Sequence, residues 1–164
     1  MKGKMKLLAT SLLLVVAPSK FAFAASETGT AQATIQAAVA VSQNQVLDFA
    51  TILPDPAGDT VTLTSLAAIS SNTGGSAFSG TTSAGQFLVT GDANSVVTLQ
   101  FGTGATLTGA GTAIPLGNFT TDTLTPSMDG TGNLTFDVGG QITIGANQTA
   151  GLYTGNYTVT VAYQ

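Results

Sequence analysis

NLTFDVGGQITI, residues 133–144, is the stretch that decides the fold of this 164-residue chain. Apolar side chains stand at every second position on both sides of a glycine pair: Leu134, Phe136, Val138, Ile142 and Ile144. Alternation with a period of two is typical of a β-strand with one buried face. Two such runs joined by two glycines are typical of a hairpin with a two-residue turn, so we expect a turn at Gly139-Gly140.

The end of the chain, YTGNYTVTVAYQ, has the same period over residues 153–164. Tyr157, Val159, Val161 and Tyr163 share one face of the predicted strand, and mostly threonines occupy the other. Chain ends usually fray unless a sheet holds them. An ending this regular therefore indicates that the C-terminus is tied into a sheet.

The remaining alternating segments complete an all-β pattern. Residues 30–41 are predicted to form a strand with Ile35, Ala37, Val39 and Val41 on one face, since β-branched residues favour a strand over a helix. We expect further strands over residues 46–52, 60–66, 86–90 and 95–101, and a surface loop over residues 70–83. Short strands at this spacing predict an immunoglobulin-like β-sandwich over residues 42–164, preceded by an N-terminal extension over residues 25–41.

The first 24 residues have the three parts of a secretory signal peptide. Three lysines precede an apolar run over residues 7–17, and the small-residue sequence Ala22-Phe23-Ala24 follows. We predict cleavage between Ala24 and Ala25, with export through the inner membrane to the periplasm and then to the cell surface. A membrane anchor would need about 20 apolar residues, and Pro18 interrupts this run, so we expect no membrane span in the mature chain.

The residue types of the mature chain exclude most catalytic chemistry. All four lysines precede residue 21, and the chain contains no Arg, His or Cys. Ser-His-Asp and Cys-His catalysis, lysine Schiff bases and Cys/His zinc sites are therefore excluded. The eight carboxylates, unopposed by any cation after residue 20, disfavour binding to nucleic acid. We expect no enzyme, no cofactor and no nucleic-acid partner.

Calcium is the one metal that the remaining side chains suit. Oxygen ligands are plentiful in residues 55–59 and 129–133. Neither segment matches the EF-hand loop, and acidic residues beside Gly or Pro are typical of ordinary turns. We therefore predict no metal site.

The arrangement of the two ends favours self-association. An exported β-protein with an apolar N-terminal strand and a regular C-terminal strand has the parts needed for strand exchange between subunits. In that mode, an extended segment of one chain adds to an incomplete sheet of another. The sequence thus predicts a structural protein that binds copies of itself.

The two ends also resemble a known group. The ending Gly151-x-Tyr153-x-Gly155-x-Tyr157-x-Val159-Thr160-Val161-x-Tyr163 and the earlier Leu47-Asp48-Phe49 are similar to secreted bacterial β-proteins related to spore coat protein U. That group includes subunits of archaic chaperone-usher pili, and a neighbouring domain-of-unknown-function family shares the same ends. The chain lacks the cysteine that such pilus subunits commonly carry after the donor strand, which favours the uncharacterised neighbour.

The resemblance implies an incomplete immunoglobulin-like fold completed by donor-strand exchange. It also implies a periplasmic chaperone, an outer-membrane usher and a fimbria or pilus-like fibre. Residues 30–41 would be the donor strand, with the groove-facing residues Ile35, Ala37, Val39 and Val41. The strand that flanks the groove would carry Tyr157, Val159, Val161 and Tyr163.

The alternative is that residues 30–41 form the first strand of a complete sandwich. The protein would then be a monomeric surface or biofilm-matrix protein without catalytic activity. The sequence leaves both readings open, because they differ only in which chain fills the groove.

Overall fold

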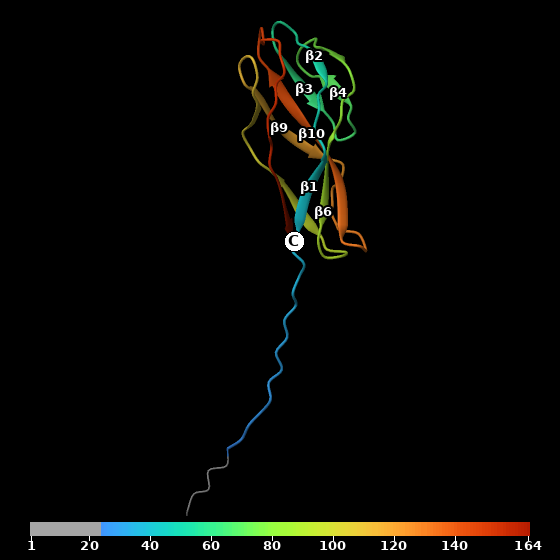
Figure 1. Ribbon diagram of the computed structural model, residues 1–164, viewed down its shortest axis with the longest axis vertical. Helices are drawn as coiled ribbons and strands as arrows, with labels where there is room; N and C mark the ends of the chain where they lie inside the picture. Colours follow the sequence, from blue (N-terminus) through green and yellow to red (C-terminus); the bar gives the residue numbers. More distant parts are fainter. Residues whose placement is uncertain (1–23) are drawn as a thin grey trace, which may run out of the picture. The chain divides into compact units, whose positions relative to one another are not determined.

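Strand β10 (Asn133–Ile144) is the longest strand and organises the main sheet. In the computed structural model, which describes residues 24–164, β10 pairs antiparallel with three other strands (Figure 1). Its first half pairs with β6 (Gly85–Thr90), and its second half pairs with β3 (Asp59–Leu63). Across the middle it pairs with β9 (Ile114–Thr121). One strand therefore connects most of the sheet.

The predicted hairpin at Gly139-Gly140 is wrong. A two-residue turn of the common type needs positive φ angles at both positions, and neither glycine has one. Instead the pairing with β9 shifts register between Gly139 and Gln141, as at a β-bulge. A side chain on Gly139 would collide with the backbone of Leu63 and Ser65. The glycines thus allow close packing and a bend within one continuous strand.

The other strands extend the main sheet and form two smaller antiparallel sheets. The main sheet continues through β1 (Ala40–Gln45), which pairs with β6, β4 (Ile69–Ser71), which pairs with β3, and β8 (Ala105–Leu107), which pairs with β9. Two smaller sheets consist of β11 (Val159–Tyr163) with β7 (Val97–Phe101), and β2 (Thr51–Leu53) with β5 (Ala77–Ser79). Within residues 24–164 no helix occurs. The predicted all-β, sandwich-like fold is confirmed.

Several strand boundaries differ from the sequence expectation. Residues 24–39 belong to no strand, because β6 ends at Thr90, opposite Ala40, and offers earlier residues no pairing partner. The predicted strand over residues 30–41 is therefore wrong except at its end. The expected loop over residues 70–83 is also wrong, since it contains part of β4 and all of β5.

Other expectations hold in part. Strands do lie within or near residues 60–66, 86–90 and 95–101. Of the segment 46–52, only its last two residues enter a strand, and the strand expected over residues 153–164 is limited to β11. The sequence predicted no strand at β8 or at β9. In β9, Pro115 and Gly117 interrupt the alternation of apolar and polar residues.

Two clusters of buried side chains form the core, and β10 contributes to both. We call the first the β3 cluster: Phe49, Val61, Leu63, Ile114, Leu116, Ile142 and Ile144. We call the second the β6 cluster: Phe87, Val89, Val97, Met128, Phe136 and Val138. Phe119 and Tyr157 pack against both clusters and so lie at their junction.

We expect Phe136→Ala to destabilise the domain by about 3–5 kcal/mol, because it leaves a cavity in the core. Phe136 is fully buried and its ring stacks on Phe87 at 5.6 Å. Urea unfolding measures the change. Leu124→Ala serves as the control, because Leu124 is 97% exposed and should change stability by no more than about 0.5 kcal/mol. Equal effects of the two substitutions would contradict this placement of the core.

A buried carboxylate fixes the loop that follows β4. Asp59 is 2% exposed, and it accepts hydrogen bonds from the hydroxyl of Ser71 (2.6 Å) and the amide of Gly74 (2.7 Å). Burial alone raises the pKa of Asp59, but hydrogen bonds from Ser71, Ser76, Thr73 and Gly74 outweigh it. The pKa of Asp59 therefore lies well below its usual value.

This lowered pKa predicts a loss of stability in acid. Because the folded-state pKa lies below the unfolded value of about 3.9, the stabilisation is fully present above that pH and is lost as the pH falls. We expect Asp59→Asn to be less stable at pH 7 by about 1–3 kcal/mol and to lose less stability on acidification. Urea midpoints between pH 7 and pH 2 test this. The control is Glu27→Gln, whose exposed carboxyl lies outside any strand; an acid response of Asp59→Asn identical to that of this control would contradict the prediction.

Candidate functional site

The four predicted donor residues lie in different environments. Ile35 is 94% exposed and belongs to no strand. Ala37 is hydrogen-bonded through its backbone, Val39 packs against the β6 cluster, and Val41 lies in β1 opposite Val89. Three of the four thus contact their own domain, and their role as a donor strand stays a prediction.

The four residues predicted to flank a groove lie together on one face of the C-terminal segment. Tyr157, Val159, Val161 and Tyr163 are half-buried and pack against the β6 cluster, while the residues between them are exposed. Tyr157 precedes β11, and the other three belong to it. The alternation predicted from the sequence is confirmed here.

β11 has one unpaired edge. Among the described strands its partner is β7 alone, and the amides of Gly102 and Gln164 donate to the carbonyls of Thr158 and Val96 at the two ends of this ladder. In an antiparallel pair, residues alternate between hydrogen-bonded and non-hydrogen-bonded positions. The backbone N–H and C=O groups of Val159 and Val161 therefore point away from β7. β1 is likewise an edge strand, since β6 is its one partner among the described strands.

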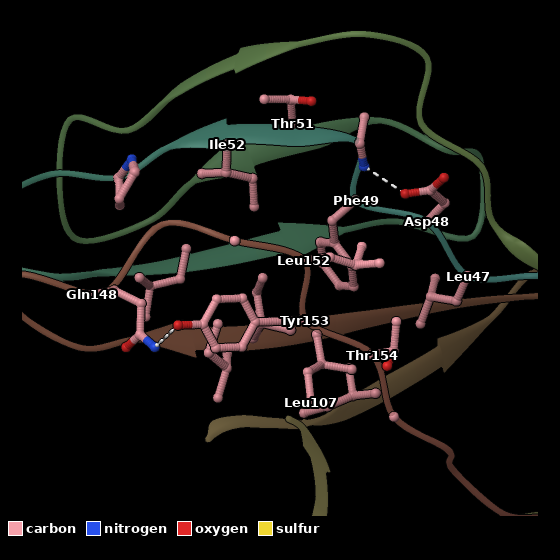
Figure 2. A pocket seen from close by; sticks show the side chains of 18 of the residues that line it. Leu47, Asp48, Phe49, Thr51, Ile52, Leu107, Gln148, Leu152, Tyr153 and Thr154 are labelled. Atoms are coloured by element: carbon pink, nitrogen blue, oxygen red, sulfur yellow. Dashed lines mark hydrogen bonds between the residues drawn. The ribbon is translucent and has the colours of Figure 1, made fainter. Parts of the chain in front are cut away.

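A cavity of about 830 Å³ opens beside the β3 cluster. Two segments flank it, residues 46–54 near the start of the domain and residues 148–155 near its end. Figure 2 shows Phe49 and Ile52 on one side and Tyr153 and Leu107 on the other. The floor consists of apolar side chains of the β3 cluster: Ile114, Leu116, Ile142 and Ile144.

The two flanking segments are each paired on the side away from the cavity. In the first, Asp48 exchanges two backbone hydrogen bonds with Ser83, and β2 pairs with β5. In the second, Thr154 exchanges two backbone hydrogen bonds with Thr108. Within the described residues, the two segments that flank the cavity are therefore not hydrogen-bonded to each other.

Exposed apolar side chains stand at the rim. Leu53 is 72% exposed and Leu152 is 82% exposed, and both line the cavity. The one charged lining residue is Asp48, whose carboxylate accepts a hydrogen bond from the amide of Ala50 at 2.8 Å. Ala50 has a φ of 56°, so this bond holds a tight local turn. The chemistry of the cavity is thus that of an apolar binding surface.

Tyr157 joins the cavity to the junction of the two clusters. Its ring stacks on Phe119 with a centroid distance of 4.9 Å and meets Phe87 edge-on at 5.9 Å. Its hydroxyl is buried and has no hydrogen-bond partner among the described residues. Burial raises the pKa of Tyr157 to about 12, because ionisation would place a charge in apolar surroundings.

Sequence reasoning missed the cavity, because its walls come from opposite ends of the domain. The available signals were Leu53 and Leu152, large apolar residues in turn-like sequence between Ile52 and Pro54 and between Gly151 and Tyr153. Asp92, an acidic residue beside Gly91, has the sequence pattern of an ordinary turn, whereas its carboxylate accepts a hydrogen bond from the amide of Ala37 across 55 positions of sequence.

The structure reports on metals and membranes only within residues 24–164. In that part of the chain, no three His, Cys, Asp or Glu side chains lie close enough together to hold a metal ion. No helix there is long and apolar enough to cross a membrane. The predicted signal peptide lies outside the described residues except for its last residue, Ala24.

Comparison with known proteins gives one match. A family model described as a domain of unknown function, DUF4402, matches residues 39–163. No curated protein and no solved structure matches the chain. The match begins at Val39, whose side chain packs against the β6 cluster, and it covers every strand described above.

The unpartnered hydroxyl of Tyr157 gives a test of this geometry. We expect Tyr157→Phe to keep or slightly increase stability at pH 7, because a buried hydroxyl without a partner costs about 1–3 kcal/mol. Tyr153→Phe is the matched control, since its hydroxyl donates to Thr149 and accepts from Gln148, and it should lose about 1 kcal/mol. Urea unfolding compares them; a larger loss for Tyr157→Phe would contradict the unpaired state of its hydroxyl.

Proposed function

We propose that this chain, which belongs to the DUF4402 family, is an exported structural subunit of a fimbria or pilus-like surface fibre. Its copies would bind one another by donor-strand exchange. The observation that carries the proposal is the apolar cavity of about 830 Å³ between residues 46–54 and 148–155. Within residues 24–164 no hydrogen bond joins its two flanking segments, so an added strand would pair with the backbone of one of them and place alternate side chains on the apolar lining.

The proposed occupant is the N-terminal segment of a second copy. After Glu27 this segment carries no charge until Asp48, and apolar residues alternate in it at Ala31, Ala33 and Ile35. A strand that adds to an open sheet uses its backbone for affinity and alternate side chains for specificity. An uncharged segment with period-two apolar residues therefore matches an apolar cavity.

The dimensions are compatible. Residues 25–36 span about 40 Å when extended, at about 3.3 Å per residue. The flanking segment 46–54 spans at most about 30 Å by the same measure. The N-terminal segment is thus long enough to line the cavity of a neighbour.

The resemblance of the two chain ends to proteins related to spore coat protein U supports the same proposal. From it we propose a periplasmic chaperone that covers the cavity before assembly, an outer-membrane usher, and a final location at the cell surface. The absence of His, Cys and Arg from the sequence supports a protein that is not an enzyme. Self-association is then its main binding activity.

A second candidate is a monomeric, self-complete surface or matrix protein. The pairing of β1 with β6 of the same chain favours it, as does the packing of Val39 in its own β6 cluster. In this case the cavity would be a surface depression without a strand. The two candidates differ in whether residues 25–36 of one copy contact another copy.

Cysteine cross-linking tests the proposal, because the natural chain has no cysteine. Chains with Ile35→Cys are mixed with differently tagged chains that carry Leu152→Cys at the cavity rim, and disulfides form on air oxidation. We expect covalent mixed dimers and, without boiling, a ladder of oligomers in gel electrophoresis. Deletion of residues 25–36 should remove the ladder.

Leu66→Cys is the matched control, because Leu66 is 82% exposed like Leu152 but does not line the cavity. It should give no mixed dimers. A single monomer band from the full-length mature chain, with equal cross-linking at the two leucine positions, would overturn the proposal and favour the self-complete protein.

A further inference from the structure

Three hydrogen bonds close a ring around the backbone of Ala37. Its amide donates to Oδ1 of Asp92 at 2.9 Å, and its carbonyl accepts from the hydroxyl of Tyr163 at 2.9 Å. The amide of Asp92 donates in turn to the same tyrosine oxygen at 2.7 Å. Both polar backbone groups of one residue in an otherwise unpaired segment are therefore satisfied. We call this arrangement the Ala37 clasp.

The clasp joins three distant parts of the sequence. Ala37 lies in the N-terminal segment, Asp92 follows β6, and Tyr163 is the last residue of β11. The site is also sterically adapted to the tyrosine, because a side chain at Gly91 would collide with its hydroxyl and approach Met128 to 3.0 Å. A glycine beside Asp92 thus leaves room for the ring of hydrogen bonds.

The residues that follow Ala37 pack and pair within the domain. Val39, two residues on, packs against the β6 cluster, and β1 begins at Ala40 in register with Thr90. Before the clasp, Ile35 is 94% exposed. Between Ile35 and β1, hydrogen bonding and packing to the rest of the domain are thus seen from Ala37 onward.

We propose that Asp92 and Tyr163 are positioning residues that hold Ala37, keep Val39 and Val41 in their own subunit, and leave residues 25–36 as the part that reaches a second copy. The inference rests on the proposed function for its second copy, but the clasp itself belongs to a single chain. Of the four residues first predicted to enter a groove, it assigns Ile35 to the neighbouring subunit and the other three to their own. The tyrosine at the end of β11 thereby fixes the length of the donated segment.

Hydrogen exchange tests the clasp in the full mature chain. By NMR, we expect the Ala37 amide to exchange about tenfold faster in Asp92→Ala than in the natural protein, because its acceptor is lost. Asp92→Asn should restore slow exchange, since its side-chain oxygen still accepts. Leu124→Ala, which changes an exposed side chain outside the clasp, should leave the Ala37 amide unchanged.

These exchange rates test whether the Ala37 clasp exists, independently of fibre formation. An Ala37 amide that exchanges in the natural protein as fast as an unprotected amide would overturn the clasp, whether or not fibres form. Failure of Asp92→Asn to restore protection would also overturn it, because a general loss of structure would then explain the alanine variant.

Assembled material tests which subunit holds the segment after the clasp. Ser42 in β1 lies opposite Leu88 in β6, at a spacing that suits a disulfide. We expect chains carrying both Ser42→Cys and Leu88→Cys to form a disulfide within one chain. Mixed chains carrying one cysteine each should form no covalent dimer. Covalent mixed dimers would overturn the inference, because β1 would then belong to the neighbouring subunit, while donor-strand exchange itself would still hold.

Discussion

The pairing of β10 with β6, β9 and β3 is the constraint on which the rest of the structure depends. Because this single strand contributes Phe136 and Val138 to one cluster and Ile142 and Ile144 to the other, it couples the two halves of the core. The bend between the halves occurs at Gly139-Gly140, where a side chain on Gly139 would collide with the backbone of Leu63 and Ser65. The cavity lies beside one half and the Ala37 clasp beside the other.

How much of the fold could be predicted from the sequence depends on how far apart along the chain the interacting residues lie. Alternation in residues 134–144 and 157–163 reports directly on which side chains face the core, and there the prediction of strands succeeded. The same pattern could not distinguish a turn from a bulge at Gly139-Gly140, because that choice depends on the backbone of Leu63 and Ser65. The strand expected at residues 30–41 failed because pairing partners, and not propensity, determine where β1 begins.

Less of the candidate site than of the fold could be predicted from the sequence. The resemblance to proteins related to spore coat protein U implied a place beside a groove for Tyr163, but its hydroxyl also donates a hydrogen bond to a residue 126 positions earlier. Its partner Asp92 has no local feature that separates it from a solvated turn residue. The cavity similarly depends on the meeting of residues 46–54 with 148–155, and each segment by itself resembles an ordinary loop.

Both the cavity rim and the N-terminal segment expose apolar side chains. A large exposed apolar surface promotes aggregation of a folded protein unless a partner covers it. The rim leucines at 53 and 152 and the isoleucine at 35 are all largely exposed. In the proposed fibre, a second copy would bring the cavity and the N-terminal segment together without any new residue type. Because the clasp holds the chain at Ala37, such copies would join through different surfaces on each partner, and a contact of that kind extends into a fibre when its rotation does not close.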